Sequence, residues 1–199
     1  MTENKIKSKN INTTSCNLHY IESGTRGNRS VILLHGMKFK AETWQELATL
    51  DKLAAAGLRG LALDMPGFGE SPACETEQDS VLAEFIQAME VDKPILLGPS
   101  MGGRIALEFA LNHPNVLGGL ILVGAVGVEE NKERLAELDL PVLILWGGSD
   151  QISPPVNGEI LEKGIKGAKR QVFAGAPHPC YLDQPDDWHR AVLDFVGTL

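Results

Sequence analysis

The fold is decided by the stretch Pro94-Ile95-Leu96-Leu97-Gly98-Pro99-Ser100-Met101-Gly102, which is followed by the helix-like segment Gly103–Leu111. The apolar run at its start predicts a buried strand, so Ser100 stands at the apex of a tight turn between a strand and a helix. The glycines two positions before and after the serine leave room for a strained backbone that exposes the hydroxyl. The stretch therefore predicts a nucleophile elbow, the turn that presents a reactive serine.

Strand-like and helix-like segments alternate along most of the chain. The strand-like runs are residues 17–21, 31–34, 60–63, 95–98, 120–124, 142–146 and 171–173. The helix-like segments are residues 43–56, 79–89, 100–111 and 185–196. The inner runs are continuously apolar, which is typical of strands that are covered on both faces. This pattern predicts an α/β fold with a mostly parallel central sheet and helices on both faces, in which a site forms at the carboxyl ends of the strands.

Length and charge narrow the class of protein. The chain has 199 residues, of which 43% are hydrophobic and 22% charged, and these values suit a single globular domain. We expect one domain over residues 1–199, with residues 1–14 either poorly ordered or forming an edge strand. The formal net charge of −8 argues against a nucleic-acid partner and against a polybasic membrane anchor.

The cysteines and the apolar segments bear on location. Cys16, Cys74 and Cys180 are scattered and have no C-x-x-C spacing, so we interpret them as reduced thiols rather than as a disulfide framework or a zinc site. The polar segment 1–10 lacks the apolar core of a signal peptide, and the apolar segment 118–128 is too short to cross a bilayer. These features predict a cytoplasmic location without membrane contact.

Polar residues that follow the predicted strands supply the candidate chemistry. A serine hydroxyl needs a base within hydrogen-bond reach, and the base needs an acid that fixes its tautomer. Asp150 and His178 follow the last two strand-like runs, downstream of Ser100. The chain order Ser, Asp, His is the one expected for an elbow of this kind. We predict Ser100 as nucleophile, Asp150 as acid and His178 as base, against the alternatives of a turn aspartate and a surface histidine.

Other polar residues compete for these roles. Asp64 follows an earlier strand than the order requires, so we expect it to organise its own Pro-Gly-rich loop, residues 64–71. We expect His35 to bond neighbouring backbone and His189, in the last helix-like segment, to be exposed. No histidine pair or Asp/His cluster has the spacing of a metal site, and no cofactor is implied.

Acyl transfer also needs hydrogen-bond donors for the developing oxyanion. The backbone N–H of Met101, directly after Ser100, is one candidate, and the backbone N–H of Met37 is the second. The two methionine side chains either line an apolar acyl pocket or fill gaps. Cys180 is interpreted as a buried structural thiol rather than as a second nucleophile.

Three further stretches carry a family resemblance: residues 33–45, residues 62–71 and the unusual run His178-Pro-Cys-Tyr-Leu-Asp-Gln-Pro-Asp-Asp-Trp-His189. With them the chain resembles the α/β-hydrolase fold over nearly its whole length, and more narrowly the small lidless CIB-type abhydrolase-domain proteins. The resemblance implies the same triad as the residues do. One departure is Pro177, which stands where the family usually has a glycine and would stiffen the loop before the histidine.

Larger proteins of this fold carry a helical cap between the sixth strand and the strand that leads to the acid. Here only residues 129–140 lie in that interval, enough for one short helix. We therefore expect an α/β-hydrolase fold with no cap domain and an open site, in which the loops 37–41 and 67–72 select the substrate.

These inferences predict a carboxylesterase-like serine hydrolase (class EC 3.1.1) that cleaves small acyl esters or related acyl compounds without a cofactor. The resemblance also implies a variant chemistry, removal of acetyl groups from amines with or without transfer to coenzyme A, and a protein partner. The rival class is a binding or adaptor protein on a hydrolase scaffold, since fold does not fix function. An intact triad argues against that rival.

Overall fold

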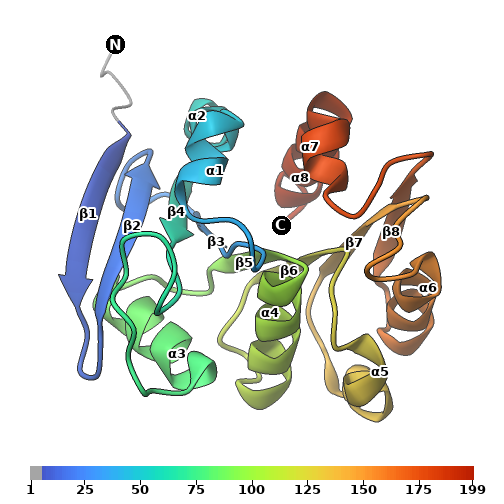
Figure 1. Ribbon diagram of the computed structural model, residues 1–199, viewed down its shortest axis with the longest axis horizontal. Helices are drawn as coiled ribbons and strands as arrows, with labels where there is room; N and C mark the ends of the chain where they lie inside the picture. Colours follow the sequence, from blue (N-terminus) through green and yellow to red (C-terminus); the bar gives the residue numbers. More distant parts are fainter. Residues whose placement is uncertain (1–5) are drawn as a thin grey trace.

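A twisted sheet of eight strands runs through residues 6–199, the part of the chain that this computed structural model describes (Figure 1). The strands lie in the order β1-β2-β4-β3-β5-β6-β7-β8, and all pairs from β4 to β8 are parallel, whereas β1 and β2 are antiparallel. Their bounds are β1 Lys7–Asn12, β2 Asn17–Ser23, β3 Ser30–Leu33, β4 Arg59–Leu63, β5 Ile95–Pro99, β6 Gly119–Val123, β7 Val142–Gly147 and β8 Lys169–Phe173. The predicted α/β class with a mostly parallel sheet is confirmed.

Helices cover both faces of the sheet. Figure 1 shows α1, α2, α7 and α8 on one face and α3, α4, α5 and α6 on the other. Their bounds are α1 Glu42–Glu46, α2 Thr49–Ala55, α3 Gln78–Ala88, α4 Met101–Asn112, α5 Val128–Asn131, α6 Pro155–Gly164, α7 Cys180–Asp183 and α8 Pro185–Val196, with a 3₁₀ helix, η1, at Lys132–Glu137. Only α5 and η1 stand between β6 and β7, so the expectation of a fold without a cap is confirmed.

The core consists of two layers, one on each face of the sheet. In β5, Ile95 and Leu97 belong to the buried cluster that contains Trp188 of α8. The residue between them, Leu96, belongs to the cluster that contains Phe109 of α4. Successive side chains of a strand point to opposite faces, so a strand covered on both sides must be apolar throughout. This is the physical reason for the continuous apolar runs in the sequence.

The helix expected over residues 43–56 is two helices. Ala48 adopts a left-handed conformation with φ 57°, which ends α1 and starts α2 in a new direction. The apolar spacing continues across the break because Trp44 of α1 and Leu50 of α2 both reach the same buried cluster. Periodicity alone therefore could not reveal the interruption.

The expectation of three reduced thiols is wrong for two of them. Cys16, in the turn between β1 and β2, forms a disulfide with Cys74, in the loop between β4 and α3, at a Cα–Cα distance of 6.0 Å. The two residues lie 58 positions apart, so no local spacing pattern announces the pair. The predicted cytoplasmic location thereby loses its cysteine argument and stays a prediction.

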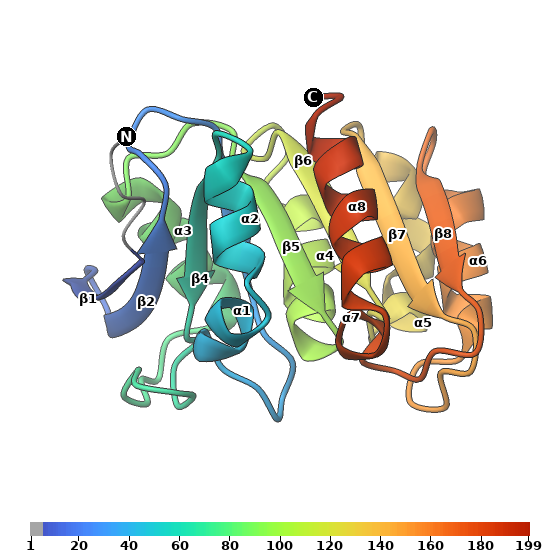
Figure 2. The ribbon, with the colours of Figure 1, turned by 90° about the horizontal axis from the view of Figure 1, so that it is seen from above.

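At the amino end, Lys7–Asn12 forms the edge strand β1, whereas residues 1–5 lie outside the described part of the chain. Within residues 6–199, no helix combines the length and the apolar character needed to cross a membrane. Figure 2 shows that the loops after β3, β4 and β7 gather at one edge of the sheet, at the carboxyl ends of the parallel strands, while the carboxyl terminus of the chain lies at the opposite edge.

Candidate active site

Ser100 occupies the sharp turn between β5 and α4, with φ 52° and ψ −115°. Close backbone packing on both sides explains the glycines of this turn. A Cβ at Gly98 would lie 2.1 Å from the carbonyl oxygen of Gly102, and a Cβ at Gly102 would lie 2.7 Å from the carbonyl oxygen of His35. Only glycine fits at either position, and the strained serine is the conformation expected at a nucleophile elbow.

Asp150 and His178 meet at the same edge of the sheet. His178 Nδ1 lies 2.7 Å from Asp150 Oδ2. The other carboxylate oxygen, Oδ1, accepts hydrogen bonds from the amides of Ile152 at 2.9 Å and Ser153 at 2.8 Å. Asp150 is only 4% exposed, so these donors compensate a buried charge. The two amides fix the carboxylate and leave one oxygen for the histidine.

The loops that carry the acid and the base are joined by their backbones. The Ser149 amide donates to the Ala176 carbonyl at 2.9 Å. Asp150 is the residue after Ser149, and His178 lies two positions after Ala176. A Cβ at Gly147 would lie 2.2 Å from the carbonyl oxygen of Pro177, so this approach requires glycine. The predicted residues are therefore brought together by a contact between the ends of β7 and β8.

The end of β6 connects this pair to the serine. The Ser100 amide donates to the Val123 carbonyl at 2.9 Å. A Cβ on the next residue, Gly124, would lie 3.1 Å from Asp150 Oδ2 and 3.3 Å from His178 Nδ1. Within residues 6–199, His178 Nε2 is buried and has no hydrogen-bond partner. Buried ring nitrogens are normally paired, and this is the atom with which a histidine base accepts a serine proton.

The two predicted oxyanion donors lie beside the serine. A Cβ at Gly36 would lie 3.7 Å from Ser100 Cβ, so the turn that carries Met37 packs against the elbow. Among the described residues, neither the Met37 amide nor the Met101 amide donates to another backbone group. The Met37 side chain is 68% exposed, so it does not fill a core gap. An unpaired amide is what an oxyanion donor requires, and the oxyanion role of Met37 and Met101 stays a prediction.

Asp64, the competing carboxylate, does not contact His178. Asp64 is buried, with 1% of its surface exposed. Its Oδ2 accepts a hydrogen bond from the Glu70 amide of its own loop at 3.0 Å and lies 2.7 Å from His19 Nδ1. It also reaches a second loop by accepting from the Ala41 amide at 2.6 Å. No pattern in the sequence indicates the contacts of Asp64 with His19 and with Ala41, because they join three separate segments.

His35 makes the backbone contacts expected of it. Its Nδ1 donates to the Gly36 carbonyl at 2.9 Å, and its Nε2 accepts from the Met65 amide at 3.1 Å. Burial lowers the pKa of His35, which keeps the ring neutral and able to accept that bond. His35 is thus part of the frame around the site.

The expectation that His189 is exposed is wrong. His189 is buried, not exposed: α8 turns it against α2, where its Nε2 lies 2.9 Å from Thr49 Oγ1. Burial, and then the charge of Lys52, lower the pKa of His189 to about 4.

Cys180 is a buried free thiol, as expected. Burial, and then the charge of Asp150, raise its pKa to about 12, so it is not a nucleophile at neutral pH.

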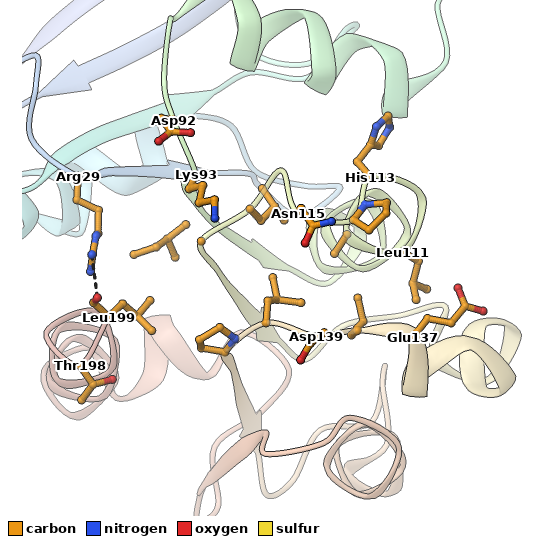
Figure 3. Close-up of a pocket in the computed structure, with 18 residues that line it drawn as sticks. Arg29, Asp92, Lys93, Leu111, His113, Asn115, Glu137, Asp139, Thr198 and Leu199 are labelled. Carbon is orange, nitrogen blue, oxygen red and sulfur yellow. Dashed lines mark hydrogen bonds between the residues drawn. The ribbon is translucent and has the colours of Figure 1, made fainter.

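A cavity of about 900 Å³ lies at the other edge of the sheet (Figure 3). It is lined by residues near the amino ends of the parallel strands, among them Arg29 and Lys93, and by Leu199, whose carbonyl oxygen accepts a hydrogen bond from Arg29 at 2.8 Å. It includes no member of the triad. No group of three or more His, Cys, Asp or Glu side chains suited to a metal ion occurs in residues 6–199.

The order of the strands in the sheet, the nucleophile elbow at Ser100 and the pair of Asp150 and His178 together define an α/β hydrolase. The family model described as "alpha/beta hydrolase fold" matches residues 29–136. The chain belongs to this family.

Several proteins of this family share more than a third of their aligned residues with this chain. The human and rat proteins named "Putative protein-lysine deacylase ABHD14B" are each 37% identical over 180 residues, covering 85% of this chain and 84% of theirs. ABHD14A of zebrafish (Danio rerio) is 36% identical over 177 residues, covering 85% of this chain and 64% of its own. These relatives support the predicted resemblance to small abhydrolase-domain proteins.

Solved structures agree with the fold. A "predicted CIB-like hydrolase" from Thermoplasma acidophilum superposes with a TM-score of 0.94 at 24% identity, covering 98% of this chain and 99% of its own. The CarC serine hydrolase of carbazole degradation superposes with a TM-score of 0.88 at 20% identity, covering 98% and 100%. At these identities the likeness concerns the fold alone.

Proposed function

We propose that this chain is a serine hydrolase that cleaves small acyl esters or related acyl compounds through Ser100, His178 and Asp150. The observation that carries the proposal is the state of the His178 ring. Its Nδ1 is bonded to the buried Asp150 carboxylate, and its Nε2 has no partner among the described residues. A ring held in this way is in the tautomer that accepts a proton at Nε2.

The geometry supports the following steps. Ser100 Oγ attacks the acyl carbon while its proton passes to His178 Nε2, and the carbonyl electron pair moves onto oxygen. The Met37 and Met101 amides donate to that oxyanion. When the carbonyl re-forms, the bond to the leaving group breaks, and the leaving group takes the proton from His178. Water then attacks the acyl-enzyme by the same route, releases the acid and restores Ser100.

Asp150 supports the histidine without exchanging a proton. Its Oδ2 stabilises the imidazolium that forms in each half-reaction, while the Ile152 and Ser153 amides hold its Oδ1. Cys180 and Asp64 take no direct part in this scheme. No step needs a metal or a cofactor, because the attacking group, the base and the oxyanion donors are all protein groups.

A second candidate is hydrolysis of acyl-lysine amides in proteins. It is favoured by the name "Putative protein-lysine deacylase" that the ABHD14B relatives carry at 37% identity. It is also favoured by the short β6–β7 connection, which leaves no cap over Ser100 and so gives a protein side chain access. The triad chemistry is the same, but the leaving group is an amine, which must take its proton from His178 before the C–N bond breaks.

A fluorophosphonate probe tests the reactive serine and separates an enzyme from an adaptor. We expect stoichiometric labelling at Ser100, located by peptide mass spectrometry, and no labelling of Ser100→Ala. Absence of labelling in the folded wild-type protein would favour the adaptor.

A substrate screen then separates the two hydrolase candidates. p-Nitrophenyl esters of increasing acyl length and an acetyl-lysine peptide are compared at matched concentration. Ester turnover with a preference for short chains supports the small-ester proposal. Faster turnover of the peptide supports the deacylase, and the Ser100→Ala protein is the blank for both.

A further inference from the structure

The loop that carries the Met37 amide is held at its two ends by the next loop along the sheet. At one end the Met65 amide donates to His35 Nε2 at 3.1 Å, and at the other the Ala41 amide donates to Asp64 Oδ1 at 2.6 Å. The loops after β3 and β4 lie at the same edge of the sheet (Figure 2). Met37 is mostly exposed, so its side chain does not anchor the loop, and the two end tethers act together with the hydrogen bond from the Phe39 amide to the Gly36 carbonyl at 3.0 Å.

The carboxylate at the second tether is itself buried and fully engaged. Asp64 is 1% exposed, and its Oδ2 accepts from the Glu70 amide at 3.0 Å and lies 2.7 Å from His19 Nδ1. A Cβ at Gly69 would lie 2.1 Å from Asp64 Oδ2, so the loop closes tightly over the carboxylate. Three N–H groups thus fix the two oxygens, and neither can shift without breaking a bond.

His19 anchors this carboxylate to the sheet. It is buried in β2, and its Nε2 lies 2.8 Å from Ser8 Oγ of the edge strand β1. Because the Asp64 carboxylate can only accept, the His19 ring carries a proton on Nδ1 and donates it to Asp64 Oδ2. The backbones are joined as well, because the Asp64 amide donates to the His19 carbonyl at 3.1 Å. The Asp64 side chain is therefore held in place by β2 directly and by β1 through His19.

We propose that His19 and Asp64 are positioning residues for the oxyanion: they hold the 35–41 loop so that the Met37 amide points at the oxygen of the acyl group on Ser100. The inference rests on the proposed hydrolase function and adds to it a second buried His–Asp pair. Neither residue makes a hydrogen bond to Ser100, Asp150 or His178, and the pair acts on the reaction through the Ala41 amide.

Asp64→Asn and two changes at His19 test the proposal. An asparagine at 64 cannot accept from both Ala41 and His19, since one of its two terminal atoms is a donor. His19→Leu removes the Nδ1 donor and leaves Asp64 in place. His19→Asn is the matched control, because its amide nitrogen can occupy the position of Nδ1 and restore the bond.

The readout is the ratio of turnover for an ester and for its thionoester, in which sulfur replaces the carbonyl oxygen. Sulfur accepts hydrogen bonds poorly, so a well-placed oxyanion donor favours the oxygen ester. We expect Asp64→Asn and His19→Leu to lose about 10- to 100-fold in kcat, below the 10²- to 10³-fold typical of removing such a donor, with KM within about twofold. The ester-to-thionoester ratio falls in both and stays near that of the wild type in His19→Asn.

A purely structural role predicts a different result. Thermal stability would then fall, but the folded fraction would keep the wild-type kcat and the wild-type ratio, and this would overturn the proposal. If Asp64→Asn does not fold, the comparison of His19→Leu with His19→Asn decides alone. Failure of the proposed function is recognised by a different result, namely ester turnover that survives in Ser100→Ala. That result would also overturn the positioning proposal, because it rests on Ser100 as the nucleophile.

Discussion

Replacing Asp150 by asparagine should disable the base while leaving the fold almost intact. In the native structure Asp150 Oδ1 accepts from two backbone amides, those of Ile152 and Ser153, and Oδ2 faces His178 Nδ1. An asparagine keeps its single oxygen toward the two amides, since its NH₂ group would otherwise face two donors. The NH₂ group then faces His178 and donates to Nδ1.

That exchange reverses the tautomer of the histidine. With Nδ1 accepting, the ring proton moves to Nε2, which can no longer take the proton of Ser100. The same substitution in a well-studied protease costs about 10⁴-fold in kcat, and this corresponds to about 5 kcal/mol of transition-state stabilisation. We expect a loss of that order here. The free energy of unfolding should change by less than about 1 kcal/mol, because the side chain keeps its shape and its two backbone bonds.

The assay is p-nitrophenyl acetate hydrolysis, with urea unfolding on the same preparations. Nitrogen NMR of labelled histidine adds a direct test, because it reports which ring nitrogen of His178 carries the proton. Asp64→Asn is the matched control, with an expected loss at least 100-fold smaller. A mild effect of Asp150→Asn together with a severe effect of Asp64→Asn on kcat would refute the assignment of the acid.

Three other predictions concern stability and are checked by urea unfolding. Converting Cys16 and Cys74 to serine should cost about 4 kcal/mol, because the disulfide closes a loop spanning 58 positions; equal stability with and without reductant in the wild type would exclude the bond. The pKa of His189 in the folded protein is about 4, below its ordinary value of 6.5, so protons bind preferentially to the unfolded chain in this range. The free energy of unfolding of the wild type should therefore fall by up to about 3 kcal/mol as the pH drops from 6.5 to 4, and this fall should be absent in His189→Gln. The same pH dependence of stability in both proteins would contradict this. Gly98→Ala should prevent folding or cost several kcal/mol, whereas Gly57→Ala, at φ 75° with open space around it, should cost about 1 kcal/mol; similar losses in both would refute the packing argument.

The features that the sequence predicted well depend on neighbours in the chain. The run 95–98 and the observed strand Ile95–Pro99 agree closely, because burial on both faces requires consecutive apolar residues. The turn at Ser100 could be anticipated because the glycines that make room for it stand two positions away. The meeting of Asp150 and His178 followed from the rule that parallel strands bring their carboxyl ends to one edge.

The features that escaped prediction depend on contacts between distant segments. The disulfide of Cys16 pairs a hairpin turn with a loop 58 positions away, and the burial of His189 depends on Thr49 from another helix. The pairing of His19 with Asp64 joins a strand to a loop 45 positions further on. In each case the partner is chosen by the packing of whole elements, so no spacing rule along the chain could identify it.

Hydrolysis by Ser100→Ala tests the central claim most directly. The substitution removes the hydroxyl that we propose attacks the acyl carbon, and the alanine should be accommodated in the turn with little change in fold. We predict that the purified variant unfolds in urea like the wild type and loses at least about 10⁴-fold in kcat, as other triad serines do when they are removed. A folded Ser100→Ala protein that hydrolyses esters at a rate near that of the wild type would contradict the claim that Ser100 is the nucleophile.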